Sequence, residues 1–195
     1  DEALRKRVFE VGDMIDVHYV RQKQQMGLAD AILTARKHVG DEPFAVLTGD
    51  DILLPAKGGK PAIREIIDVA EKRGASCVGA TAVDPAVASR FGVFDAVPLG
   101  GGEYKVNGVV EKPPAGHAPS NLVSNGRYVF TPEYFDAVEN TALDSRKEKN
   151  WADAATVLMR SQPLYAKEFT GRWIPVGDKL SFVKATIELA LENPE

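Results

Sequence analysis

Residues 43–51 read Pro43-Phe44-Ala45-Val46-Leu47-Thr48-Gly49-Asp50-Asp51, a compact apolar run that ends in a glycine and two aspartates. Such a run is typical of a strand buried inside a sheet. Open α/β sheets bind ligands beyond the carboxyl ends of their strands, so we expect the Asp50 carboxylate to project into such a site. Carboxylate oxygens suit Mg²⁺, whereas the competing interpretation is that Asp50 caps a helix or turn. Asp51 is the neighbouring alternative for the same metal.

Helix and strand patterns alternate on both sides of this stretch. Residues 2–11 and 31–38 carry apolar side chains at helical spacing, and residues 15–20 alternate as a short strand does. The other expected elements are a helix from Pro61 to Gly74, strands over 76–83, 126–131 and 164–169, hairpin arms over 92–97 and 104–110, and helices from Pro132, over 151–160 and over 178–191. This order predicts an α/β fold with a mixed, mostly parallel sheet, flanking helices and a hairpin insertion.

Composition excludes several classes of protein. The chain has 195 residues, of which 44% are hydrophobic and 27% charged, and this size and balance suit one globular domain. Its net charge of −4 comes from interleaved acids and bases, which argues against a nucleic-acid partner. No apolar run is long enough for a membrane span, and no basic segment opens a signal peptide. The single Cys77 lies in an apolar run, so we expect a buried structural thiol and a reducing cytoplasm.

Five short motifs follow one another between residues 15 and 135. They are Val20-Arg21-Gln22-Lys23 with Gly27-Leu28, the stretch 39–51, Arg90-Phe91-Gly92-Val93, Val110-Glu111-Lys112-Pro113, and Ser120-Asn121-Leu122 with Gly126-Arg127-Tyr128-Val129. In this order they resemble the sugar nucleotidyltransferases, in particular the bacterial and archaeal UTP–glucose-1-phosphate uridylyltransferases. The resemblance implies a Rossmann-like nucleotide-diphospho-sugar transferase fold, with residues 1–195 in a single nucleotidyltransferase domain.

The resemblance also implies a reaction and its partners. We expect magnesium-dependent transfer of a uridylyl group from UTP to glucose 1-phosphate by in-line attack at the α-phosphorus, which gives UDP-glucose and pyrophosphate. The expected partners are therefore UTP, glucose 1-phosphate and UDP-glucose, with no nucleic acid or membrane and with a homo-oligomer left open. Two alternatives remain: a non-catalytic nucleotide-sugar-binding or regulatory relative, and a glucose-1-phosphate thymidylyltransferase.

The nucleotide contacts are expected from Gln22, Gly27 and Asp50. A glutamine amide can satisfy the adjacent donor and acceptor atoms of a pyrimidine, and a glycine lets the backbone approach the flat base. The competing interpretation of Gln22 and Gly27 is a polar loop before a helix. The resemblance favours Asp50 over Asp51 as the metal ligand, and it gives Asp50 and Lys112 the catalytic roles.

The sugar contacts are expected from Gly92, Glu111, Lys112, Asn121 and Gly126. In the resemblance, Glu111 accepts hydrogen bonds from sugar hydroxyls and Lys112 meets the phosphate, roles that suit an acceptor-only carboxylate and a compact cation. A solvated ion pair is the alternative for Glu111 and Lys112. For the other three residues the alternative is the local chemistry of hairpins and strand ends.

Other polar and aromatic residues add no separate chemistry. The three histidines match no zinc-ligand spacing. Trp151 and Trp173 could stack on a base, but we expect them to be core residues.

Two departures from the family pattern bear on activity. Nothing in residues 1–14 resembles the family's Gly-rich triphosphate-binding turn, so we expect a domain that is incomplete at its N-terminus and weak turnover by this chain alone. In the stretch 173–178, Pro175 stands where the family has a second metal-binding aspartate. Asp178 could replace that aspartate only if the loop were shifted.

Overall fold

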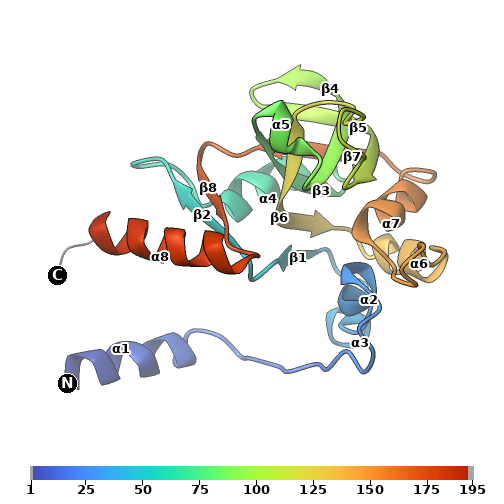
Figure 1. Cartoon of the computed structure of the whole chain (residues 1–195). Helices are drawn as coiled ribbons and strands as arrows, with labels where there is room; N and C mark the ends of the chain where they lie inside the picture. The colour runs from blue at the N-terminus through green and yellow to red at the C-terminus, as the bar shows by residue number, and fades with distance from the viewer. Residues whose placement is uncertain (1, 193–195) are drawn as a thin grey trace.

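A six-stranded mixed sheet organises the chain, which a computed structural model describes over residues 2–192 (Figure 1). Its strands in spatial order are β1 (Phe44–Leu47), β6 (Leu122–Phe130), β3 (Cys77–Ala82), β7 (Leu164–Glu168), β5 (Glu103–Glu111) and β4 (Gly92–Gly100). Within the described residues, β3 and β7 are the only parallel neighbours, although β1, β3, β4 and β7 all point the same way. The predicted α/β class and mixed sheet are confirmed, and "mostly parallel" holds for strand direction but not for pairing.

A separate two-stranded ribbon was not predicted. It joins β2 (Asp51–Pro55) to β8 (Gly171–Pro175) in antiparallel register, with Asp51 opposite Pro175. Both strands are short and end in proline, which removes a ladder donor. The ribbon carries a C-terminal segment back to the residues that follow β1.

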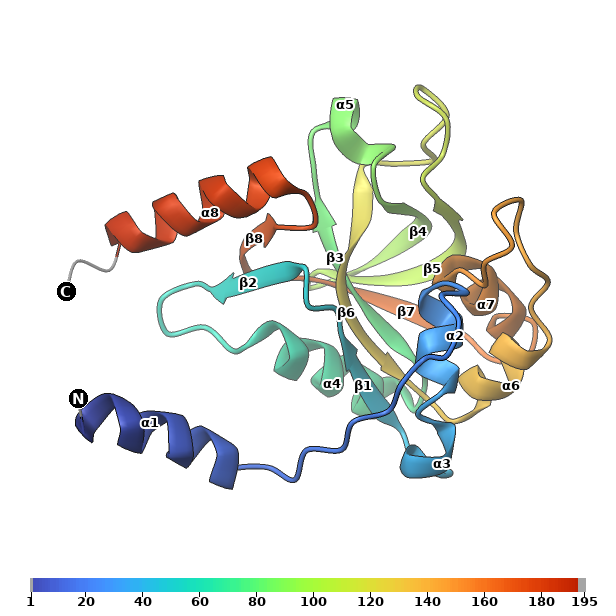
Figure 2. The same cartoon turned by 60° about the horizontal axis from the view of Figure 1, so that its bottom comes forward.

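Helices cover both faces of the large sheet (Figure 2). The helices of the described residues are α1 (Glu2–Asp13), α2 (Leu28–Leu33), α3 (Arg36–Val39), α4 (Ala62–Arg73), α5 (Pro85–Ala88), α6 (Glu133–Glu139), α7 (Trp151–Leu158) and α8 (Lys179–Glu192). The larger core joins α2, α6 and α7 to one face, and the smaller core joins α4 to the other. No helix in residues 2–192 has both the length and the apolarity to cross a membrane.

The strand β3 shows how alternation divides its side chains between the two cores. Cys77 packs in the α4 core, whereas the next residue, Val78, packs in the core under α6 and α7. Burial raises the pKa of the Cys77 thiol to about 12 and leaves it 0% exposed. The predicted burial of this cysteine is confirmed.

Local stop signals act as predicted at two glycine-containing turns. Gly74 ends α4 in the left-handed conformation, with φ 60° and ψ 35°. Between β4 and β5, residues 100–102 all have positive φ, so the predicted hairpin is confirmed.

The N-terminal region differs from the prediction. Residues 15–20 form no strand, and α1 lies apart from the sheet in both views (Figures 1 and 2). Side chains in this stretch remain in solvent, with Ile15 65% and Tyr19 94% exposed. The predicted strand was wrong because an alternating pattern describes a half-buried strand only where another strand is available to pair with it.

The expected helix over residues 31–38 is divided into α2 and α3. Between them, the Thr34 hydroxyl donates to the Ala31 carbonyl oxygen at 2.6 Å, a bond that competes with continued helical pairing. Strand β6 begins four residues earlier than the predicted strand at 126, because residues 122–124 pair with β3.

Candidate functional site

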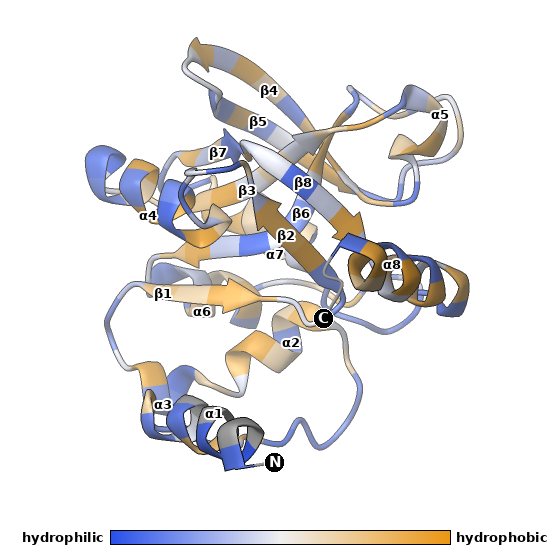
Figure 3. Cartoon of the chain, turned by 90° about the vertical axis from the view of Figure 1, so that its left-hand side faces the viewer, coloured by the Kyte–Doolittle hydropathy of each residue, from blue (hydrophilic) through white to orange (hydrophobic). Residues whose placement is uncertain are grey.

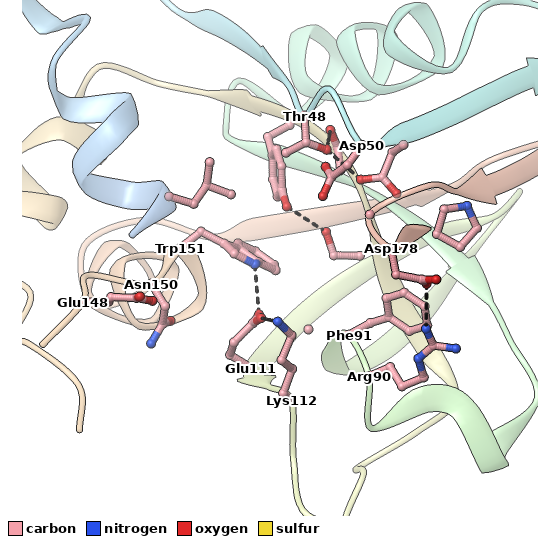
Figure 4. A pocket seen from close by; sticks show the side chains of 18 of the residues that line it. Thr48, Asp50, Arg90, Phe91, Glu111, Lys112, Glu148, Asn150, Trp151 and Asp178 are labelled. Atoms are coloured by element: carbon pink, nitrogen blue, oxygen red, sulfur yellow. Dashed lines mark hydrogen bonds and ion pairs between the residues drawn. The ribbon is translucent and has the colours of Figure 1, made fainter. Parts of the chain in front are cut away.

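A cavity of about 460 Å³ lies where β1 and β5 end, against the middle of β6 and beside the β2–β8 ribbon (Figure 4). Five predicted site residues line it: Asp50, Gly92, Glu111, Lys112 and Gly126. These residues come from segments that are far apart in sequence. The structure therefore brings most of the predicted site together, while the role of each residue remains a prediction.

Three predicted site residues do not line this cavity. The Gln22 amide donates to the Gly27 carbonyl oxygen at 3.1 Å and to Asp30 Oδ2 at 2.7 Å. Asn121 is exposed and donates to the Val83 carbonyl oxygen at 3.1 Å. Each amide thus has a partner within the protein.

Gly27 is explained by a close backbone contact. Its φ is +91°, and a Cβ atom there would lie 2.5 Å from the Lys149 carbonyl oxygen. The backbone of Met26 also accepts a 2.7 Å hydrogen bond from the Lys149 amide. The next residue, Leu28, does line the cavity, so the loop that contains Gln22 and Gly27 reaches its edge.

The two adjacent aspartates have different surroundings. Asp51 Oδ2 accepts a hydrogen bond from Thr48 Oγ1 and Oδ1 accepts one from Trp173 Nε1, each at 2.6 Å. Burial raises the pKa of Asp51, although these two hydrogen bonds act in the opposite direction. Within the described residues, no side chain or backbone group donates to the Asp50 carboxylate, which faces the cavity (Figure 4). Asp51 therefore links the start of β2 to Thr48 and to Trp173 of β8. Of the two aspartates, Asp50 has the carboxylate that is left to bind a ligand in the cavity.

Few further ligands for a metal surround Asp50. Its backbone carbonyl accepts from Val176, and a Cβ on Gly177 would lie 3.1 Å from Asp50 Oδ2, so the end of β8 packs against it. Pro175 lines the cavity at this place and supplies no side-chain ligand. Residues 2–192 hold no cluster of three acidic, histidine or cysteine side chains that could bind a metal.

Asp178 lies on the same wall but is held at the start of α8. Its oxygens accept from the Ser181 hydroxyl at 2.6 Å and from the backbone amides of Leu180 and Ser181. These bonds lower the pKa of Asp178, and Arg90 approaches it at 3.5 Å. The donor set fits Mg²⁺ in the mode in which one or two carboxylates share the ion with substrate phosphates.

Glu111 and Lys112 form the opposite wall. Burial raises the pKa of Glu111, whereas Lys112 and the Trp151 hydrogen bond act to lower it. The Lys112 ammonium lies 3.9 Å from Glu111 Oε1, and the Lys112 side chain is 58% exposed. Lys112 also has φ +46°, a rare conformation for a side-chain-bearing residue that is enriched at functional sites. Glu111 is thus enclosed by protein groups, whereas the Lys112 side chain stays largely in solvent, as in the ion pair that is its alternative.

The two cavity-lining glycines permit close packing of the walls. Gly126 has φ +76°, and a Cβ there would collide with Asp51 Oδ2 and Thr48 Oγ1. Gly92 pairs with Glu111 in the β4–β5 ladder, and a Cβ there would meet the Trp151 ring at 2.7 Å and Glu111 Oε2 at 3.0 Å. Both glycines are thus required by neighbouring side chains of the cavity.

Several residues that line the cavity were not predicted as site residues from the sequence. They are Arg90, Arg146, Trp151 and Trp173. Arg90 begins the motif Arg90-Phe91-Gly92-Val93, but Arg146 lies in a loop whose sequence carries no periodic signal. The tryptophans were expected to be core residues, and Trp151 is indeed only 5% exposed, yet both indole N–H groups bond to cavity carboxylates. The signal that could have identified the two tryptophans is that a buried indole N–H requires a hydrogen-bond acceptor.

Comparisons with known proteins match the whole described chain. The nucleotidyl transferase family profile matches residues 2–192. A UTP–glucose-1-phosphate uridylyltransferase of Staphylococcus haemolyticus is 43% identical over 195 residues, which cover 100% of this chain and 66% of that protein. The corresponding Bacillus subtilis protein is 40% identical, with 98% of this chain and 65% of that protein covered. The chain therefore spans slightly less than two thirds of these relatives.

Solved structures give the same result for the fold. A UDP-glucose pyrophosphorylase complexed with UDP-glucose superposes with a TM-score of 0.91 at 30% identity, covering 96% of this chain and 71% of that chain. A UTP-bound enzyme of the same name from Acinetobacter baumannii has a TM-score of 0.81, also at 30% identity, and 98% and 68% are covered.

Proposed function

The chain belongs to the nucleotidyl transferase family, and on this premise we propose that its cavity serves uridylyl transfer from UTP to glucose 1-phosphate. The products are UDP-glucose and pyrophosphate. The observation that carries the proposal is the meeting of Asp50, Glu111 and Lys112 around one cavity, in the order of motifs that suggested this chemistry. The names of the relatives support UTP over dTTP and glucose as the sugar. We place the reaction in the cytoplasm, and residues 1–195 in one domain.

The proposed reaction needs alignment more than covalent catalysis. A phosphate oxygen of glucose 1-phosphate attacks the α-phosphorus of UTP, and the bond to the pyrophosphate oxygen breaks in line. Asp50 would hold Mg²⁺ together with substrate phosphates, and the ion would neutralise charge on the phosphoryl oxygens. Lys112 supplies a cation at the cavity wall, and Arg146 supplies a second one from the facing loop.

Sugar recognition falls to Glu111. Its ionised carboxylate accepts hydrogen bonds from hydroxyl groups and can donate none. Because its pKa is raised by burial, the accepting form of Glu111 becomes dominant at a higher pH than for an exposed glutamate. We propose that Gln22 and Gly27 read the base from the cavity edge, which requires the Gln22 amide to exchange its contact with Asp30 for the ligand. Gly92, Asn121 and Gly126 stay proposed sugar-side residues, of which Asn121 has the least support.

Calorimetric titration of UDP-glucose in the presence of Mg²⁺ tests the binding part of this proposal. Lys112→Met should weaken binding roughly tenfold, because it removes a charge-assisted contact to phosphate. Lys105→Met is the matched control, since Lys105 is an exposed lysine of β5, the strand that Lys112 directly follows, and does not line the cavity. Equal losses in the two variants would contradict the proposed phosphate contact.

A binding or regulatory role is the second candidate, and the observation that favours it is Pro175 beside Asp50. The two candidates differ in pyrophosphate release from UTP and glucose 1-phosphate, which can be followed with a coupled phosphate assay. Binding of UDP-glucose without any pyrophosphate release would favour the regulatory role.

A further inference from the structure

Trp151 joins the helix α7 to the carboxylate of Glu111 in β5. Its ring packs between Phe94 and Tyr128, with centroid distances of 6.0 and 5.0 Å, and only 5% of the residue is exposed. Its indole Nε1 donates to Glu111 Oε2 at 3.2 Å, as the dashed line in Figure 4 marks. The ring is therefore a core side chain whose polar edge reaches the cavity.

The two oxygens of Glu111 consequently have different neighbours. Oε2 is held by Trp151 and lies against Gly92, whose missing Cβ leaves the space for this contact. Oε1 is the oxygen nearer to Lys112, at 3.9 Å from its ammonium. A carboxylate fixed at one oxygen can rotate little, so the direction of its second oxygen is set by the first.

We propose that Trp151 is a positioning residue, which uses its indole N–H to fix the Glu111 carboxylate so that Oε1 is presented to the hydroxyl groups of a bound sugar phosphate. The identity of the ligand rests on the proposed function, but the fixing of the carboxylate does not. A smaller apolar side chain could occupy this core position but would leave Oε2 without this donor.

Charge around Glu111 determines how the loss of this donor can be detected. Lys112 and Arg146 favour the ionised carboxylate, whereas burial and the charge of Asp153 oppose it. The indole N–H also favours the ionised form, because a donor binds an ionised carboxylate more strongly than a protonated one. Removing the N–H should therefore raise the pKa of Glu111, an effect that mere loss of packing volume does not predict.

Two variants separate the donor from the ring. Trp151→Phe keeps an aromatic ring and removes the N–H, and replacement of Trp151 by β-(3-benzothienyl)alanine keeps the bicyclic shape and replaces the N–H by sulfur. Carbon-13 NMR of labelled glutamate side chains, assigned with Glu111→Gln, should give a higher pKa for Glu111 in both variants. Trp173→Phe is the matched control, because it removes an indole donor from Asp51 instead and should leave the Glu111 pKa unchanged.

The second readout is the contribution of the sugar to binding. Calorimetry should find UDP-glucose bound roughly tenfold more weakly by the benzothienylalanine variant, with UDP itself bound as before. An unchanged Glu111 pKa in that variant would overturn the positioning role. Equal affinity of the unaltered chain for UDP-glucose and UDP would instead overturn the proposed function, so the two failures are distinguishable.

Discussion

Gly126 illustrates how a single residue can be required by the side chains around it. It lies within β6, has φ +76°, and faces the hydrogen-bonded oxygens of Thr48 and Asp51. A methyl group at this position would have to displace a bond that connects β1 to the β2–β8 ribbon. Two costs are therefore expected from its substitution, one from the backbone and one from the clash.

Gly126→Ala should lower the free energy of unfolding by about 3 kcal/mol, from backbone strain and overpacking together. Gly58→Ala separates the two contributions, because Gly58 has nearly the same φ, +74°, but no atom within 4 Å of its Cβ position. That control should cost about 1 kcal/mol. Urea unfolding of the unaltered chain and the two variants measures both losses in the free energy of unfolding. Equal losses would show that the collision at position 126 does not destabilise the fold.

Glu111 gives a pH dependence with a definite sign. Its folded-state pKa is raised by burial, so the folded state binds this proton more tightly than the unfolded state. The contribution to stability is complete below the unfolded pKa and is lost as pH rises through the folded pKa. Glu111→Gln should therefore be more stable than the unaltered chain at pH 7, and this advantage should vanish towards pH 4.

Urea midpoints at the two pH values measure this effect. Asp51, whose pKa is raised in the same direction, is present in both proteins and cancels in the comparison. If Glu111→Gln were less stable than the unaltered chain at pH 7, the ionised Glu111 carboxylate would be stabilised by Lys112 and Trp151.

At the scale of residues, position along a predicted strand was the useful information. Asp50, Glu111 and Lys112 could be placed from sequence because each follows or ends a strand that the pattern identifies. The hydrogen bonds of Gln22 and Asn121 could not, since their partners depend on how the surrounding loops close. The indole contact of Trp151 depends on a helix meeting a hairpin, which no local pattern encodes.

At the scale of elements, the β2–β8 ribbon is the part that sequence patterns missed. Strand β2 begins at Asp51, the second of the two aspartates, and both β2 and β8 are only five residues long, so neither segment alternates clearly. Their pairing nevertheless shapes the proposed metal site, because it places Pro175 opposite Asp51 and on the cavity wall that also holds Asp50. Long, periodic elements such as α4 and the β4–β5 hairpin were predicted from their caps and turns.

Pro175→Asp should create a better metal site at the end of this ribbon. A carboxylate there would add an oxygen ligand next to Asp50, and affinity for divalent cations rises with the number of charged ligands. We expect Mn²⁺ to bind at least roughly tenfold more tightly, as measured by electron paramagnetic resonance titration.

Pro175→Asn is the control for this substitution, since asparagine has nearly the same shape as aspartate but carries no charge. If the asparagine and aspartate variants bound Mn²⁺ equally, the added charge would not be responsible. If neither bound the ion more tightly, the side chain at position 175 would not reach the metal.

At the scale of the whole molecule, stability is distributed unevenly. Apolar residues concentrate in the strands near the centre, and α8 carries alternating apolar and polar bands (Figure 3). The strand β6 is almost entirely buried and residues 77–80 of β3 are buried, whereas Met14 is 77% exposed in the stretch that follows α1. The parallel β3–β7 pair joins segments more than 80 residues apart, and such long-range order could not be deduced from local patterns.

Hydrogen exchange followed by mass spectrometry should report this distribution. Amides of α1 and of residues 14–20 should exchange rapidly, and those of β3, β6 and β7 should exchange only through global unfolding. Comparable protection of α1 and β6 would mean that α1 packs against the chain in solution. The exposed helix α8 is the internal reference, because only Ala185 of its residues is buried.

The enclosed thiol of Cys77 makes the opening of this sheet measurable. It is the chain's single cysteine, so any reaction with a chromogenic disulfide reagent reports one defined place. Both its 0% exposure and its pKa of about 12 suppress that reaction while β3 stays beneath α4. The rate of this thiol reaction in the native protein therefore measures how often α4 separates from the sheet. A slower reaction after a nucleotide sugar is added would reveal binding without any label.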